Sequence, residues 1–193
     1  MKSTTHNKSP LTQLRSVILL AALSIAACGC SLDPDKMAPD AAASPSTWTT
    51  GHSVRVMDVT SGFNNQGSFF GGPAMIDNDQ FKTALVLTLK KSNLFTDVST
   101  DHGDVDLYAT IKSQKQVDSM GVFQYTAEML VSYKFVDKSG KEVWSASYES
   151  EFSSTALAGA TRTLEAREGS ARENLTSLVQ GIREKWPREA AAP

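Results

Sequence analysis

The sequence has little cysteine, and charges of the two signs almost balance. Its 193 residues include only two cysteines, Cys28 and Cys30, which lie close together near the amino terminus. No disulfide can therefore join distant parts of the chain, so a packed core has to stabilise the fold. The 19 basic residues face 21 acidic ones and form no basic cluster. This balance predicts that nucleic acid is not a partner.

Residues that catalysis or metal binding would require are also sparse. The three histidines are His6, His52 and His102, and none has a cysteine or another histidine at ligand spacing. A zinc site needs three or four converging ligands. His102 lies between Asp101 and Asp104, a pattern that favours a solvated turn over an acid–base site. No Gly-x-Ser-x-Gly motif occurs. We therefore expect no enzyme activity, no cofactor and no metal.

Long hydrophobic runs are absent, and the longest apolar stretch lies near the start of the chain. Three basic residues, Lys2, Lys8 and Arg15, precede the apolar run 17–27. This run is too short to cross a bilayer, which takes roughly 20 residues. A basic start, a short apolar run and small residues at its end are typical of a secretory signal peptide. The sequence therefore predicts that residues 1–27 are a signal peptide and that the rest is exported.

The end of this segment resembles a bacterial lipobox. Residues 25–28 read Ile-Ala-Ala-Cys. The resemblance implies cleavage before Cys28 and the attachment of three acyl chains, such as palmitate, to this residue. Three chains would anchor the protein stably on a membrane, because one chain alone binds only marginally. Gly29 follows where an aspartate would imply retention at the inner membrane. The resemblance therefore implies the periplasmic face of the outer membrane.

Two alternatives to lipidation at Cys28 stay open. Ordinary cleavage after Ala27 would release a soluble periplasmic protein. Cys30 is a weaker lipidation candidate, because a cysteine would then occupy a lipobox position where small or branched residues are usual.

The rest of the chain divides by composition. Residues 28–50 contain three prolines among Ala, Ser, Asp and Thr, which predicts a flexible tether behind the lipidated cysteine. Residues 188–193 are expected to form a disordered tail. The segment between them, 51–187, is long enough for one hydrophobic core and predicts a single periplasmic domain.

Hydrophobic periodicity predicts a strand and a helix at the start of this domain. Apolar and polar residues alternate over Ser53–Thr60, as in a half-buried strand. Asp77 and Gln80 have the spacing of a capping box, and helical periodicity follows over residues 78–92. Asn93 is a plausible left-handed terminator of that helix.

The second part of the domain alternates with period two. Short strands are predicted over Leu94–Thr100 and around residues 105–111. The alternation is longest from Val122 to Val136, a loop with glycine follows at 137–141, and the returning strand runs through 144–152. These segments predict antiparallel hairpins.

A long helix is predicted at the carboxyl end, and Pro187 terminates it. Apolar residues recur there at helical intervals, namely Leu164, Ala171, Leu175, Leu178, Val179, Ile182 and Trp186. The element order is strand, helix, three or four antiparallel strands and helix. The predicted fold class is α+β, with one mostly antiparallel sheet and helices packed on one face. The β-α-β opening should be a right-handed crossover.

Four stretches, residues 81–85, 91–95, 104–107 and 136–144, carry a resemblance to known proteins. They resemble a group of small bacterial envelope lipoproteins with an anticodon-binding-like α+β domain. The lipopolysaccharide-assembly lipoprotein and the periplasmic part of the curli-secretion lipoprotein are members. The resemblance implies a non-catalytic domain that binds protein or lipid as an accessory or assembly part of an envelope machine.

One glycine-rich segment is a candidate contact loop. Its aromatic residues, Phe63, Phe69 and Phe70, and the nearby Pro73 lie among glycines that disfavour regular structure. Such a loop can dock on a partner, touch lipid or cover an apolar pocket. Alternatively, the three rings fold back on the sheet as satellite core. A second candidate is the small, polar stretch 153–162, for which a plain connector to the last helix is the alternative.

Two function classes remain. The first is an outer-membrane-anchored periplasmic binding module, in which the sheet or the aromatic loop contacts an envelope protein of a transport or assembly complex. The second is a carrier or sensor of an apolar envelope ligand such as lipid or glycolipid. Co-purification with a protein would favour the first class, and bound lipid would favour the second.

Overall fold

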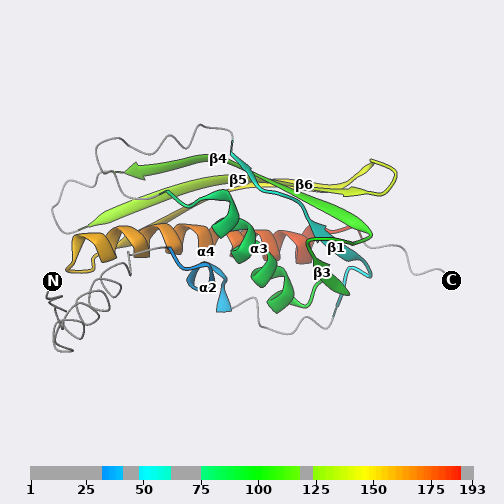
Figure 1. Ribbon diagram of the computed structural model, residues 1–193, viewed down its shortest axis with the longest axis horizontal. Helices are drawn as coiled ribbons and strands as arrows, with labels where there is room; N and C mark the ends of the chain where they lie inside the picture. Colours follow the sequence, from blue (N-terminus) through cyan, green and yellow to red (C-terminus); the bar gives the residue numbers. More distant parts are fainter. Residues whose placement is uncertain (1–31, 41–47, 62–74, 118–123, 188–193) are drawn as a thin grey trace, which may run out of the picture. The chain divides into compact units, whose positions relative to one another are not determined.

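The computed structural model describes residues 32–40, 48–61, 75–117 and 124–187 (Figure 1). All of them belong to one compact unit, which starts at Leu32. The elements are α2 (Pro34–Met37), β1 (Ser53–Val56), β2 (Thr60–Ser61), α3 (Asn78–Ser92), β3 (Asp97–Ser99), β4 (Val105–Val117), β5 (Tyr125–Asp137), β6 (Glu142–Ser154) and α4 (Gly159–Lys185).

One six-stranded sheet organises the unit, and the predicted α+β class is confirmed. The strand order is β3-β1-β4-β5-β6, and β2 pairs with β4 off this path. The long neighbours β4, β5 and β6 are antiparallel, whereas the short strand β1 is parallel to β3 and β4. Figure 1 shows α2, α3 and α4 on the same side of the sheet. The other side carries no helix among the described residues.

The strand β5 shows why the sheet has one apolar and one polar face. Its alternate residues are buried under the helices, and the residues between them point to the other face. The buried set is Tyr125, Ala127, Met129, Val131, Tyr133 and Phe135. At one end of this core, Phe135 packs edge-on against Trp186 and Trp144, with ring centroids 5.0 and 5.6 Å apart. The aromatic contacts fix the carboxyl end of α4 to the sheet.

The predicted caps of α3 are confirmed. The Asp77 side chain accepts a hydrogen bond from the Gln80 N–H at 2.7 Å, and the Gln80 side chain accepts one from the Asp77 N–H. Asn93 ends the helix in the left-handed conformation. Both signals are local, so the sequence alone was sufficient to find them.

The helix α4 carries two glycines where aromatic residues of β6 approach it closely. A side chain at Gly169 would overlap the Phe152 ring, and one at Gly181 would overlap the Tyr148 ring and hydroxyl. The glycines therefore let β6 pack directly on the helix backbone.

A buried polar network also connects α4 to the sheet. The Tyr133 hydroxyl donates to Asn174 Oδ1 at 2.7 Å, and Asn174 Nδ2 donates to the Tyr148 carbonyl at 2.7 Å. Asn174 is fully buried. Burial raises the pKa of Tyr133 well above its ordinary value. These bonds satisfy polar groups that would otherwise be costly to bury.

Residues Leu32–Asp40 are folded, although their composition predicted a flexible tether. This part of the predicted linker contains α2, which packs against α3 and α4. Leu32, Met37 and Ala38 are buried, and the Asp33 N–H donates to the buried Glu168 at 2.9 Å. The flexible-tether prediction is therefore wrong for these nine residues, because their few apolar side chains complete the helical layer.

Candidate functional site: the open face of the sheet

The site residues singled out in the sequence lie outside the described residues. This holds for Cys28 and for the four contact-loop residues, Phe63, Phe69, Phe70 and Pro73. The structure does describe the two ends of that loop. The Ser61 hydroxyl donates to Asn78 on α3, and the Ile76 N–H and carbonyl both bond the Gln114 side chain on β4. The loop therefore leaves and re-enters the domain at positions that hydrogen bonds fix.

The main candidate site among the described residues is the sheet face opposite the helices, called the open face below. Outward residues of β4, β5 and β6 form it, and many are hydroxyl side chains. Three hydroxyl pairs bridge neighbouring strands: Thr60–Thr110 at 3.0 Å, Ser132–Ser147 at 2.8 Å and Thr126–Ser153 at 2.7 Å. Each pair holds two adjacent strands in register.

A shallow hollow of about 510 Å³ lies on this face. Tyr108, the one large aromatic residue exposed among the described residues, lines it and is 40% accessible. The Lys134 ammonium lies 5.6 Å from the centroid of the Tyr108 ring, a cation–π distance. The remaining lining side chains are mostly polar: Thr110, Lys112, Ser132, Glu142, Ser145 and Ser147. The hollow thus offers an aromatic surface surrounded by hydrogen-bonding groups.

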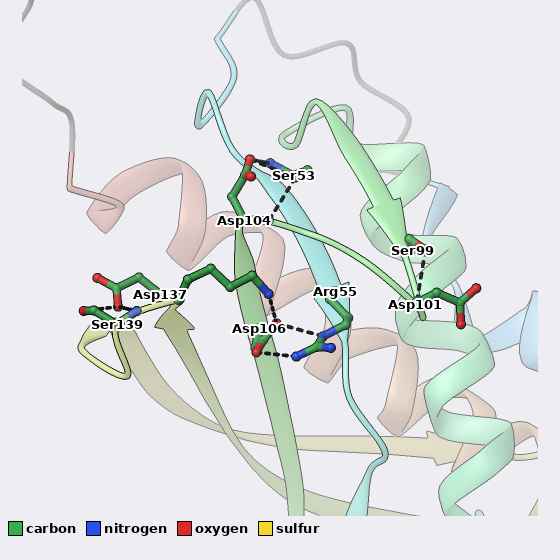
Figure 2. Close-up of polar contacts among 9 residues, drawn as sticks. Ser53, Arg55, Ser99, Asp101, Asp104, Asp106, Asp137 and Ser139 are labelled. Atoms are coloured by element: carbon green, nitrogen blue, oxygen red, sulfur yellow. Dashed lines mark hydrogen bonds and ion pairs between the residues drawn. The ribbon is translucent and has the colours of Figure 1, made fainter.

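An ion-pair cluster borders the open face where β1 lies beside β4 (Figure 2). Arg55 donates two hydrogen bonds to Asp106, at 2.9 and 2.6 Å, and Lys138 donates a third at 2.9 Å. The bond from Arg55, assisted by Lys138, holds the pKa of Asp106 below its ordinary value. The same pairing raises the pKa of Arg55. One carboxylate therefore connects β1, β4 and the β5–β6 turn.

Two further aspartates fix the chain at this end of the sheet. Asp104 accepts hydrogen bonds from the Ser53 N–H and hydroxyl, at 3.0 and 2.8 Å. Asp137 accepts from the N–H and hydroxyl of Ser139 inside the turn (Figure 2). These bonds lower the pKa of both carboxyl groups, with Ser53 and Ser139 as the main causes. The end of the open face is consequently a rigid, charged rim.

The histidine turn is exposed. His102 contacts Asp97 at 3.1 Å and the Ser99 hydroxyl at 3.2 Å, and its side chain is 73% accessible. Within the described part of the chain, no group of three or more His, Cys, Asp or Glu is placed to hold a metal. No helix in that part is long and apolar enough to span a membrane.

The second candidate loop, 153–162, is divided between other elements. Ser153 and Ser154 end β6, and Gly159 already begins α4. The connection between them exposes Leu157 almost completely, at 97%. A single exposed leucine is common on protein surfaces and does not identify a site by itself.

The arrangement is suited to recognition. Rigid strands present hydroxyls, an exposed tyrosine and fixed charges on a surface that no described helix covers. The sequence indicates the sheet as a contact surface only in general terms. The alternation in β5 predicted a polar face, whereas the gathering of Tyr108, Lys134 and the serines of β6 depends on strand register and could not be read from the sequence.

Comparison with known proteins identifies the fold and leaves the family open. No protein-family model and no curated protein matches the chain. The crystal structure of XCC0632 from Xanthomonas campestris, described with family DUF330, is 15% identical and has a TM-score of 0.56. The alignment covers 72% of this chain and 88% of that chain. The two proteins therefore share a fold.

Two other solved structures are less similar to this chain. The hypothetical protein CT253 from Chlamydia trachomatis is 10% identical with a TM-score of 0.49, covering 68% of this chain and 96% of that one. A minor lipoprotein from Acinetobacter baumannii is 11% identical with a TM-score of 0.46, covering 73% and 96%. The resemblance to lipopolysaccharide-assembly and curli-secretion lipoproteins stays a prediction.

Proposed function

We propose that this protein is a non-catalytic accessory lipoprotein of the bacterial envelope, which binds a protein partner through the open face. The observation that carries the proposal is the asymmetry of the sheet. One face is buried under three helices, and the other presents Tyr108, Lys134 and a row of hydroxyls that no described element covers. Protein interfaces are typically built from such a mixture of aromatic and polar groups.

The anchor is the second part of the proposal. The lipobox resemblance at residues 25–28 supports acylation of Cys28, and Gly29 supports delivery to the outer membrane. The packed segment Leu32–Asp40 leaves only Gly29–Ser31 between that cysteine and the domain. At about 3.5 Å per residue, the four steps from Cys28 to Leu32 span at most roughly 14 Å, so the domain would stand close to the membrane surface.

The alternative, a carrier of an apolar ligand, has less support. The space between the sheet and the helices is filled by side chains such as Tyr133, Phe81 and Leu85, which are fully buried. The hollow on the open face has a largely polar lining. Binding of an apolar molecule would require a pocket with a mostly apolar lining.

Partner capture from cells tests the proposal. A tagged protein and a variant with Tyr108→Ala and Lys134→Glu would be purified from detergent-solubilised envelopes. A matched variant, Lys90→Glu on α3, makes the same charge reversal on an exposed side chain of the opposite layer. We expect one or more envelope proteins to co-purify with the wild type and the α3 variant, and at least ten-fold less with the Tyr108 variant. Equal recovery with all three proteins would contradict a role for the open face.

A further inference from the structure

The strand β6 has one unpaired edge. It pairs antiparallel with β5 from Glu142 to Ser154 and ends the strand order. Among the described residues, no other strand pairs with it. A strand at a sheet edge presents a row of free N–H and C=O groups, to which another extended segment can add. The strand β6 has 13 residues, which is long for an edge strand, and none of the described residues covers this edge.

Exposed carboxylates lie in the carboxyl-terminal half of β6. Glu149 and Glu151 both point to the open face and are exposed. In the strand register, Glu151 lies opposite Glu128, so two like charges are neighbours, and Lys115 on β4 lies opposite Glu128 on its other side. Glu149 and Glu151 have no cation on a further strand, because β6 ends the strand order among the described residues. No Lys or Arg among the described residues forms an ion pair with any of these three glutamates. Like charges opposite each other are unfavourable in a sheet, and an opposite charge on a neighbouring strand relieves this repulsion.

The other face of the same edge offers a second feature. Phe152 points toward α4, and a hollow of about 450 Å³ opens beside it. Charged side chains of both signs line this hollow, including Lys36, Glu165, Glu168 and Arg172. The side chains of an added strand would alternate between the glutamates on one face and this polar hollow on the other.

From this geometry we infer that the β6 edge binds an extended segment of a protein partner by strand addition, and that this segment carries Lys or Arg at alternate positions facing Glu149 and Glu151. The inference rests on the proposed function, since it names the kind of segment that the partner supplies. Backbone hydrogen bonds would provide affinity, and the two basic side chains would select the partner and its register.

A second copy of the chain is a less favourable occupant. An antiparallel pairing of two β6 strands in the registers that bring Glu149 beside Glu151 of the other copy would place carboxylates opposite each other. Charged residues on an edge strand are a common protection against such self-pairing.

Peptide binding to the full-length protein in detergent tests the inference. The probe is a labelled ten-residue peptide of Thr and Val with Lys at two alternate positions, and the control peptide has Glu at these positions. We expect the Lys peptide to bind at least ten-fold more tightly by fluorescence anisotropy. Hydrogen exchange should show new protection at the alternate β6 amides that do not bond β5.

Charge reversal provides the matched control. The variant Glu149→Lys, Glu151→Lys should lose the preference for the Lys peptide and gain one for the Glu peptide. The variant Glu173→Lys, Glu184→Lys has the same net charge but changes exposed residues of α4, and it should behave as the wild type. Equal binding of both peptides, an equal effect of both variants, or protection outside β6 would overturn the inference.

Two further outcomes separate this inference from the proposed function. If the envelope partner is still recovered by the Glu149→Lys, Glu151→Lys variant and depends only on Tyr108 and Lys134, the proposed function holds and strand addition fails. A concentration-dependent dimer that charge reversal at β6 alters would show that the edge binds a second copy, and would also overturn the inference.

Discussion

At the residue scale, Asp106 is the group on which the rim of the open face depends. Its side chain is 13% accessible and accepts hydrogen bonds from Arg55 and Lys138. Replacing Asp106 with Asn removes the negative charge that Arg55 and Lys138 share. We expect the variant Asp106→Asn to lose about 1–2 kcal/mol of unfolding free energy at pH 7, measured by urea denaturation.

The pH dependence of this loss follows from the lowered pKa of Asp106. Its folded pKa lies below the ordinary value of 3.8, so its ionisation stabilises the fold above about pH 4. That contribution is lost as the pH falls through 3.8 toward the folded pKa. The difference between wild type and Asp106→Asn should therefore shrink at pH 3. A difference that stays constant with pH would show that the charge is not its cause. Asp101→Asn, an exposed change near the same rim, serves as the control.

Two neighbouring tyrosines provide a second test at this scale. The rings of Tyr133 and Tyr148 are 6.3 Å apart, and both lie between the sheet and α4. The Tyr133 hydroxyl donates to Asn174, whereas the buried Tyr148 hydroxyl has no hydrogen-bond partner among the residues that the structure describes. We expect Tyr133→Phe to cost about 1–2 kcal/mol, because it leaves the buried Asn174 carbonyl unsatisfied. Tyr148→Phe should change the unfolding free energy by less than about 0.5 kcal/mol. Equal losses in the two variants would contradict this hydrogen-bond assignment.

At the element scale, close approach of the β3–β4 connection to β1 makes one glycine, Gly103, essential. A side chain at Gly103 would overlap the backbone nitrogen of Arg55, which cannot move without breaking the pairing of β1 with β4. We expect Gly103→Ala to lower the unfolding free energy by about 2 kcal/mol or more. Gly159→Ala is the matched control. Its nearest neighbour is the end of the Arg162 side chain at 3.7 Å, and alanine favours the helix there. A thermal melt in which both variants behave alike would refute the assignment.

A second prediction at this scale concerns α2, the packed segment before β1. Met37 is completely buried, although the composition of residues 28–50 predicted a tether. If α2 belongs to the core, Met37→Ala should cost about 2–4 kcal/mol in denaturant unfolding. Leu157→Ala removes a fully exposed side chain and should have no measurable effect. An equally small effect of both changes would restore the tether interpretation for this segment.

The elements differ in how far the sequence predicts them. Local signals were sufficient to predict α3, because a capping box and Asn93 define its two ends. They were also sufficient for the β5–β6 hairpin, because period-two alternation in both strands and a glycine turn between them predict the same structure. The predicted strand 53–60 is two short strands, because the chain leaves the ladder between Val56 and Thr60. The strand β4 continues past the predicted Ile111 to Val117. Its polar second half lacks the apolar alternation by which a strand is recognised.

The buried polar side chains of α4 were not predictable from helical periodicity. The apolar stripe was correct in outline, but Arg167, Glu168 and Asn174 are also buried. Arg167 donates to the Tyr125 hydroxyl and contacts the sulfur of Met75. Each of these residues has a hydrogen-bond partner far away in the sequence, so only the tertiary structure explains why a polar side chain lies there.

At the scale of the whole molecule, the proposed membrane anchor at Cys28 would determine where the open face operates. Cys28→Ser should move the protein from the membrane fraction to the soluble periplasm and leave its melting temperature unchanged, because residue 28 precedes the folded unit. The intact mass of the wild type should equal that of residues 28–193 plus three acyl chains. An unmodified mass in the soluble fraction would instead indicate a free periplasmic protein.

The site as a whole was less predictable than the fold. Cys28 and the aromatic loop remain predictions, since both lie outside the described residues. The open face was anticipated only as the polar side of an alternating strand. Its particular residues come from three strands, and one of these, β4, has a register shift between Ile111 and Ser113. Such a shift changes which side chains face outward and has no reliable sequence signal.

Site-specific photo-crosslinking in living cells tests the central claim most directly. A photoreactive amino acid would replace Ser132, at the middle of the open face, or Lys90, on the helical layer. We predict that the Ser132 position forms a discrete crosslink to an envelope protein and that the Lys90 position forms none. Crosslinks of equal yield at both positions, or only at Lys90, would contradict the claim that this protein binds its partner through the open face of the sheet.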